Sequence, residues 1–123
     1  MHYEFNPTLK VPLSLVNPLQ LSAVKELLSR PIPDEVLGIV LFGSSLTLYC
    51  DLYSDLDLVF VVEDSSNEEL SRKIYKAFRK LGKPADILIM DKDDLTDPPR
   101  GSVEYEVLKN GVIVYAKGKN LTA

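Results

Sequence analysis

Two patterns of apolar and polar positions alternate along the chain. Apolar runs of strand length occupy residues 37–42, 56–62, 85–90 and 112–115, and such runs are typical of strands buried in a sheet. Between them, apolar residues recur every three or four positions in residues 18–28, 70–81 and 103–108, which predicts amphipathic helices. We therefore expect an α/β or α+β domain in which a single central sheet of about four strands is flanked by helices.

The predicted helices begin and end at residues that suit those positions. Pro18 fits the first position of a helix, and the side chains of Asn67 and Ser102 can accept hydrogen bonds from the first turns of the next two helices. Gly82 lies where a left-handed residue commonly ends a helix, and Gly111 can end the last one. The pattern therefore predicts helix boundaries as well as helices.

The composition is that of one globular domain. The chain has 123 residues, of which 46% are apolar and 26% charged, and this is the usual size of a domain with its own core. We expect residues 1–123 to form a single domain. Residues 1–17 are predicted to be an extended N-terminal arm, residues 91–100 a polar loop, and residues 117–123 a loose C-terminal tail.

Charge and rare residues exclude several classes of function. Fourteen basic and eighteen acidic residues give a net charge of -4, so no general positive field attracts nucleic acid. One cysteine, Cys50, and one histidine, His2, are too few for an internal disulfide or a structural zinc site. The sequence has neither a leader pattern nor an apolar run of about 20 residues, so we do not expect a membrane protein. We expect a cytoplasmic protein without intrinsic nucleic-acid binding, and self-association stays open.

A pair of aspartates begins the second predicted strand. Alternate residues of a strand project to one face, so Asp55 and Asp57 share one small volume while Leu56 projects to the other face. Like charges this close repel each other unless a cation neutralises them, and carboxylate oxygens suit a hard cation such as Mg²⁺. Taken alone, an acidic pair is more commonly a solvated strand end than a metal site.

Two further features fall near the same expected edge of the sheet. Gly43 and Ser44 end the first strand, where free backbone N–H groups and a hydroxyl can bind a phosphate, although most such dipeptides are simple turns. Asp86 begins the third strand and would join the acidic pair if that strand lies beside the second. None of these features establishes a site by itself, but their order along the chain can be compared with the order in known families.

This order resembles the nucleotidyltransferases of the DNA polymerase beta superfamily. The resemblance rests on Gly43 and Ser44, then ten residues, then Asp55 and Asp57 followed by an apolar strand, with Asp86 in the place of the third carboxylate. It extends in order from about residue 36 to residue 115, and within the superfamily the chain resembles the minimal nucleotidyltransferases. The resemblance implies the nucleotidyltransferase fold, with a mixed sheet.

The resemblance also implies a reaction and a role for each residue. Gly43 and Ser44 would hold the outer phosphates of ATP or another NTP, and Asp55 and Asp57 would bind two Mg²⁺ ions, with Mn²⁺ as an alternative. Asp86 would hold the ion that activates the acceptor hydroxyl. Two bound ions of this kind activate the attacking oxygen and stabilise the leaving pyrophosphate.

One segment departs from the pattern of the family. Many relatives carry a basic residue and then a glycine in the turn after the Gly-Ser pair, where this chain has Thr47 and Leu48. Arg72, Lys73 or Lys76 of the second predicted long helix could supply the missing cation, but such residues on an amphipathic helix are more commonly solvated.

The resemblance implies two functions that stay open at this point. In the first, the chain transfers an NMP, most simply AMP from ATP, to a hydroxyl of a helical partner protein of the HEPN type, as the antitoxin of a toxin-antitoxin pair. In the second, it is a catalytically weak or inactive antitoxin that masks this partner by forming a complex, which the change at Thr47 and Leu48 favours. A third, weaker interpretation is a nucleotide- or metal-sensing module.

Overall fold

The computed structural model describes residues 18–42, 56–82 and 84–117. In chain order, its elements are α1 (Pro18–Ser29), β1 (Val36–Leu41), β2 (Leu56–Val62), α2 (Glu68–Phe78), β3 (Ala85–Asp91), the 3-10 helix η3 (Lys92–Leu95), α3 (Val103–Asn110) and β4 (Val112–Ala116). Each predicted strand and helix is present, with ends that differ by a few residues. The predicted N-terminal arm and residues 118–123 lie outside the described residues.

The four strands form one mixed sheet in the order β3-β2-β1-β4. β1 pairs antiparallel with β2 and with β4, whereas β2 and β3 run parallel. The parallel pair is joined by α2, which is the crossover that parallel neighbours require. The predicted mixed α/β sheet is therefore confirmed, and no helix of the described residues is long and apolar enough to cross a membrane.

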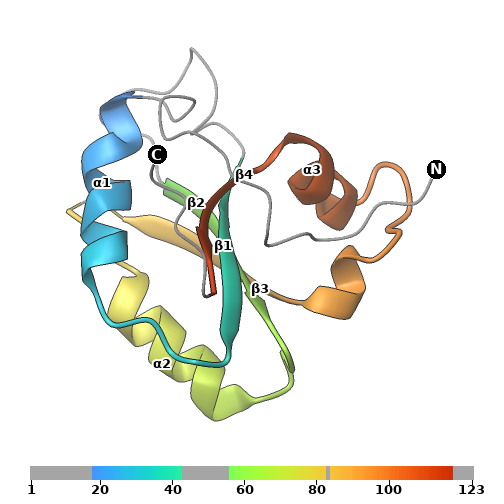
Figure 1. The fold of residues 1–123 in the computed structure, drawn as a ribbon, viewed down its shortest axis with the longest axis horizontal. Coiled ribbons are helices and arrows are strands. Elements are labelled where there is room, and N and C mark those ends of the chain that lie inside the picture. Colours follow the sequence, from blue (N-terminus) through green and yellow to red (C-terminus); the bar gives the residue numbers. More distant parts are fainter. Residues whose placement is uncertain (1–17, 43–55, 83, 118–123) are drawn as a thin grey trace.

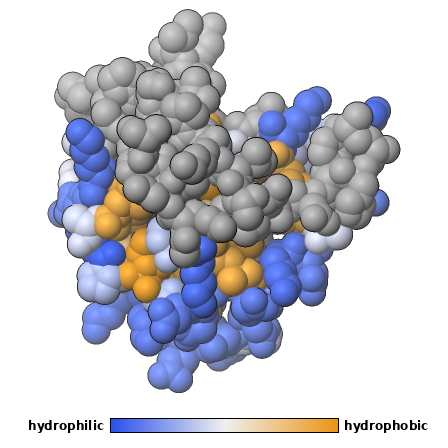
Figure 2. All heavy atoms as spheres, in the orientation of Figure 1, coloured by the Kyte–Doolittle hydropathy of each residue, from blue (hydrophilic) through white to orange (hydrophobic). Residues whose placement is uncertain are grey.

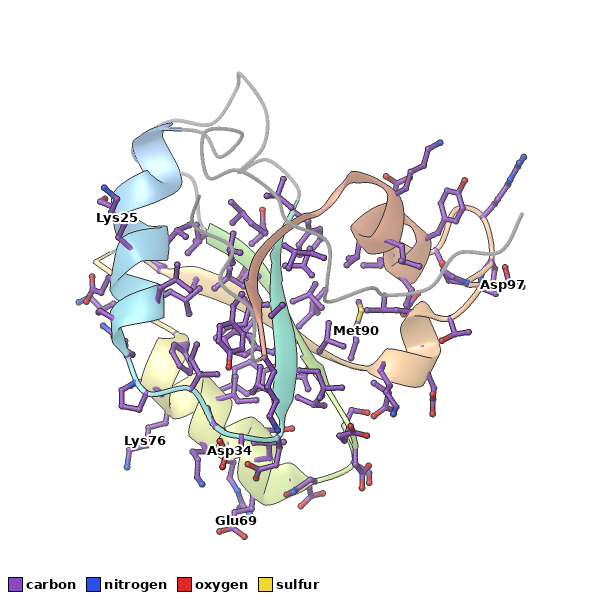
Figure 3. The ribbon with its side chains drawn as sticks, viewed as in Figure 1. Lys25, Asp34, Glu69, Lys76, Met90 and Asp97 are labelled. Atoms are coloured by element: carbon purple, nitrogen blue, oxygen red, sulfur yellow. The ribbon has the colours of Figure 1, made fainter. Side chains whose placement is uncertain are left out.

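Helices cover both faces of this sheet (Figure 1). α1 and α2 pack on one face, where Phe60 of β2 and Phe78 of α2 meet at a ring-centroid distance of 5.1 Å. α3 and η3 lie on the other face over a smaller apolar cluster that includes Val59, Val61 and Met90, and Figure 3 shows Met90 on the side of η3. The two central strands are consequently buried on both faces, as their continuous apolar sequence predicts.

The caps of α2 and α3 form as predicted, with one difference in mechanism. Asn67 accepts a hydrogen bond from the backbone N–H of Leu70 at 3.0 Å, and Ser102 accepts one from that of Tyr105 at 3.1 Å. Gly111 does end α3, but its φ is -70° and not left-handed. Glycine is needed there because a Cβ would overlap Cγ1 of Val40 and the backbone carbonyl oxygen of Val107.

The segment predicted as a polar loop, residues 91–100, is more ordered than expected, and that prediction was wrong in part. Asp91 still belongs to β3, and the next four residues form η3. The cause is Leu95, which is fully buried in the cluster beneath α3 and fixes the turn to the sheet. Lys117, predicted to begin the loose tail, donates its backbone N–H to the carbonyl of Leu37 at 3.0 Å.

Candidate active site

The candidate site is built on the parallel pair of strands. In the register of β2 and β3, Asp57 lies directly opposite Asp86. Neighbouring strands lie about 4.8 Å apart, so the two backbones hold these residues as near neighbours. The alignment that the sequence left open, with the third strand beside the second, is therefore present.

Both aspartates also lie on the same face of the sheet. On β2, Leu56 and Leu58 belong to the core under α1 and α2, whereas Val59 belongs to the cluster on the opposite face. Alternation places Asp57 on the face of Val59. On β3, Ile87 packs in the first core and Met90 in the second, so Asp86 shares its face with Met90. The two carboxylates therefore belong to the face that carries α3.

This pair lies at the rim of the sheet, where it meets solvent. Asp57 is half-buried and Asp86 is exposed. The backbone N–H of Phe42 donates to the carbonyl of Asp57 at 3.1 Å, so β1 ends beside the acidic pair. The next residues in the sequence are Gly43 and Ser44.

The turn between α2 and β3 fixes the start of both acidic strands. Gly82 has a φ of +80°, the left-handed conformation predicted for it. The backbone N–H of Ala85 donates to the carbonyl of Arg79 at 2.9 Å, and that of Leu56 donates to the carbonyl of Pro84 at 3.1 Å. One backbone reversal thus anchors the residues that precede Asp57 and Asp86.

The other predicted site residues cannot be placed. Gly43, Ser44 and Asp55 lie outside the described residues, as do Thr47 and Leu48. Within residues 18–42, 56–82 and 84–117, no group of three or more His, Cys, Asp or Glu side chains is arranged to hold a metal ion. The described part of the site is therefore a pair of carboxylates, and the roles predicted for all five residues stay predictions.

The donor chemistry of this pair fits a hard divalent cation. Two carboxylates that face each other across parallel strands supply oxygen ligands from rigid elements, and such oxygens suit Mg²⁺ or Mn²⁺. Mg²⁺ usually keeps several waters and takes one or two carboxylates together with substrate phosphates. Asp86 is exposed, so its carboxylate can bind an ion that keeps water ligands.

Three nearby features were not singled out from the sequence. Leu88 is 41% exposed and lies on the same face of β3 as Asp86, so an apolar side chain adjoins the acidic pair. Arg79 and Lys80 stand at the reversal before β3. The basic run that continues past α2 was the available signal for these two cations, whereas the exposure of Leu88 depends on β3 being an edge strand.

The cations proposed from the sequence as substitutes for the missing phosphate contact lie elsewhere. Arg72, Lys73 and Lys76 are exposed on α2, which packs on the face opposite Asp57. No contact in the described part of the chain joins them to the acidic pair. Their position agrees with the interpretation of a solvated helix face rather than a phosphate site.

Comparison with known proteins agrees with this geometry. The family model described as "Polymerase beta, Nucleotidyltransferase" matches residues 23–120, a span that includes every element from β1 to β4. A search of curated proteins found no significant match, and a search of solved structures found none either.

Proposed function

Because the chain belongs to the polymerase beta nucleotidyltransferase family, we propose that it is a Mg²⁺-dependent enzyme that transfers an NMP, most simply AMP from ATP, to an acceptor hydroxyl. Within that family we place it among the minimal nucleotidyltransferases. The observation that carries the proposal is the register of β2 and β3, which pairs Asp57 with Asp86 on one face of the sheet. Mn²⁺ is an alternative ion, and the cytoplasm would supply both substrate and metal.

The proposed reaction is a displacement at the α-phosphorus. The acceptor oxygen forms a bond to this phosphorus, the bond to pyrophosphate breaks, and the hydroxyl proton passes to a carboxylate or to water. When bound, the metal ions would lower the pKa of the acceptor hydroxyl and stabilise the negative charge of the pyrophosphate. Asp57 and Asp86, with Asp55, are the residues that would hold them.

The contribution of the protein is mainly placement. Asp57 is held by the backbone bond from Phe42, and Asp86 is held by its register with β2. Rigid positioning of this kind removes the entropy cost of bringing donor, acceptor and charge together, which can account for a large part of the acceleration in phosphoryl transfer. Gly43 and Ser44 are proposed to bind the outer phosphates of the donor.

The direct test is transfer of label from ATP. The purified chain is incubated with α-labelled ATP, Mg²⁺ and extract of its own cells, and a labelled acceptor is expected. Asp57→Asn and Asp86→Asn should each abolish the labelled product. Asp93→Asn is the matched control, because it removes the same charge from an exposed aspartate of η3. Labelling that persists in both site variants would exclude the assigned residues.

The proposed acceptor is a helical partner protein of the HEPN type, with the chain acting as its antitoxin. A specific feature supports a second candidate, in which the chain neutralises its partner by binding alone: Thr47 and Leu48 stand where many relatives carry a basic residue and a glycine. Co-expression with the partner separates the two. Full protection by an Asp57→Asn/Asp86→Asn double variant identifies masking, and loss of protection with intact binding identifies catalysis.

A further inference from the structure

The outer face of α2 carries a concentration of positive charge that the catalytic proposal does not use. Five exposed cations are spaced along one side of this helix and the turn after it: Arg72, Lys73, Lys76, Arg79 and Lys80. Within α2, Arg72 and Lys76 lie opposite the buried stripe formed by Leu70, Ile74 and Phe78, and Lys73 lies beside that stripe. The chain as a whole has a net charge of -4, so this basic face is a local departure from its overall charge.

Within the described residues, none of these five cations forms an ion pair with an acid. The ion pairs found in the described parts of the chain join Arg30 to Glu26 and Lys92 to Glu63, and none of the five cations takes part in them. Glu68 and Glu69 stand in the first turn of α2, one turn before Arg72 and Lys73, where they favour the positive helix terminus. Lys76 in the last turn has the corresponding helix-dipole explanation, which does not extend to Arg72 and Lys73.

A preformed groove adjoins this face. It has a volume of about 610 Å³ and is lined by residues 30–35 together with Lys73 and Ala77. Its backbone is restrained, because Pro31 and Pro33 have a fixed φ and the guanidinium of Arg30 donates hydrogen bonds to the carbonyl of Ala77 and to Glu26. Ligand grooves of this size are commonly largely formed before binding.

The lining of the groove distinguishes its two sides. Proline, isoleucine and alanine make its apolar part, Lys73 stands on the side of α2, and Asp34 and Glu35 stand on the other side. Figure 3 shows Asp34 and Lys76 on this part of the molecule, and Figure 2 shows hydrophilic side chains over α2 with apolar side chains above it. An occupant must therefore be apolar in the middle and acidic toward α2.

We propose that this groove and the basic face of α2 form a docking surface for a partner protein. The partner segment would place a large apolar side chain in the groove and its carboxylates against Lys73 and Lys76. Nucleic acid fits less well, because none of the lining residues is aromatic and bases therefore have no stacking platform.

This surface lies on the face of the sheet opposite Asp57 and Asp86, so a docked partner leaves the acidic rim open. The inference does not depend on catalysis. If the partner is also the acceptor, it must extend around the sheet from α2 toward β3.

The test is photo-crosslinking in the organism's own cells with the full chain. A benzophenone amino acid replaces Asp34, which keeps every cation, and a second version carries it at Lys25, an exposed position of α1 outside the groove. Figure 3 shows Lys25 directed away from the sheet. The expected result is a crosslink from position 34 to a polypeptide segment that contains a large apolar residue and several carboxylates, with little crosslink from position 25.

Charge reversal then tests the basic face itself. Lys73→Glu/Lys76→Glu should reduce the yield from position 34 by about tenfold, whereas Lys25→Glu should leave it unchanged. Lys73→Gln/Lys76→Gln gives an intermediate loss and covers the case in which the reversed variant does not fold, as judged by circular dichroism. The proposal is overturned by a nuclease-sensitive adduct, by a captured segment without carboxylates, by yields that ignore the charge changes, or by no crosslink above that of position 25.

Discussion

Asp57 and Asp86 should repel each other in metal-free protein, and this repulsion is measurable as a coupling free energy. Asp57→Asn, Asp86→Asn and the double variant form a cycle with the original chain. Either single substitution should remove the repulsion and raise the free energy of unfolding. The second substitution should then add little, so the two changes in the free energy of unfolding will not be additive. The cycle isolates the interaction between the two carboxylates from other contacts of either side chain, including those made by Asp57.

The structure sets the size of this coupling. The two residues are direct partners in adjacent strands, which puts their Cα atoms about 5 Å apart, and we take about the same separation for their charges. Two unit charges at that separation interact by about 0.8 kcal/mol in a water-like medium and by about 3 kcal/mol at the lower effective dielectric near a protein surface. Asp86 is exposed and Asp57 half-buried, so we expect a repulsion near the lower value, about 1 kcal/mol.

Urea unfolding of the four proteins at neutral pH, first with a chelator and then with Mg²⁺, measures the coupling. In chelator it should be repulsive by about 1 kcal/mol. In Mg²⁺ its sign should reverse, because the ion binds the folded original chain and not the double variant. A coupling of zero in chelator would show that the charges are too far apart. If Mg²⁺ raises the free energy of unfolding equally in the original chain and in the double variant, the ion binds elsewhere.

Three other changes test the fold. Gly111→Ala should destabilise the protein by about 1–3 kcal/mol in thermal melts, because the added Cβ would overlap Cγ1 of Val40 and the carbonyl oxygen of Val107; a fully stable variant would contradict the packing at this cap. The pKa of Asp64 lies below its ordinary value of 3.8 because the Ser66 hydroxyl, and then its backbone N–H, donate to the carboxylate. This stabilisation is present above the ordinary pKa and is lost as the pH falls through the folded one, so Ser66→Ala should raise the Asp64 pKa in an NMR titration, and an unchanged titration would refute the assignment. Asn67→Ala should cost about 1 kcal/mol in urea unfolding by removing the cap of α2, whereas no loss would mean that the cap contributes little.

Features of the fold that depend on neighbouring residues in the sequence were predictable, whereas features that depend on distant contacts were not. Asn67, Ser102 and Gly82 have the cap and left-handed conformations expected from their types, since each depends on a few neighbouring residues. The close approach of Val40 to Gly111 could not be predicted, because Val40 belongs to β1, whereas the carbonyl of Val107, which also excludes a side chain there, is a local feature of the helix end. Likewise, the order of Leu95 depends on burial beneath α3.

The candidate site shows the same division. The sequence contains the aspartates, but periodicity does not say which strands are neighbours or whether they run parallel. A shift of one residue in the register of β3 would place Asp86 on the opposite face from Asp57. The resemblance to the family indicated that Asp86 belongs with Asp55 and Asp57. In the structure, the register of β2 and β3 places Asp86 opposite Asp57.

The anchoring of both acidic strands to one backbone reversal divides the site into two separately variable parts. The spacing of Asp57 and Asp86 is set by the hydrogen bonds of Leu56 and Ala85 to the reversal and by the sheet register, whereas the predicted phosphate contacts belong to the segment between β1 and β2. Under the proposed function, substitutions at Gly43 and Ser44 would change donor affinity while the register that pairs Asp57 with Asp86 stays the same. The proposed transfer activity and the proposed docking surface on α2 could then change separately in evolution, because they would depend on different parts of the chain.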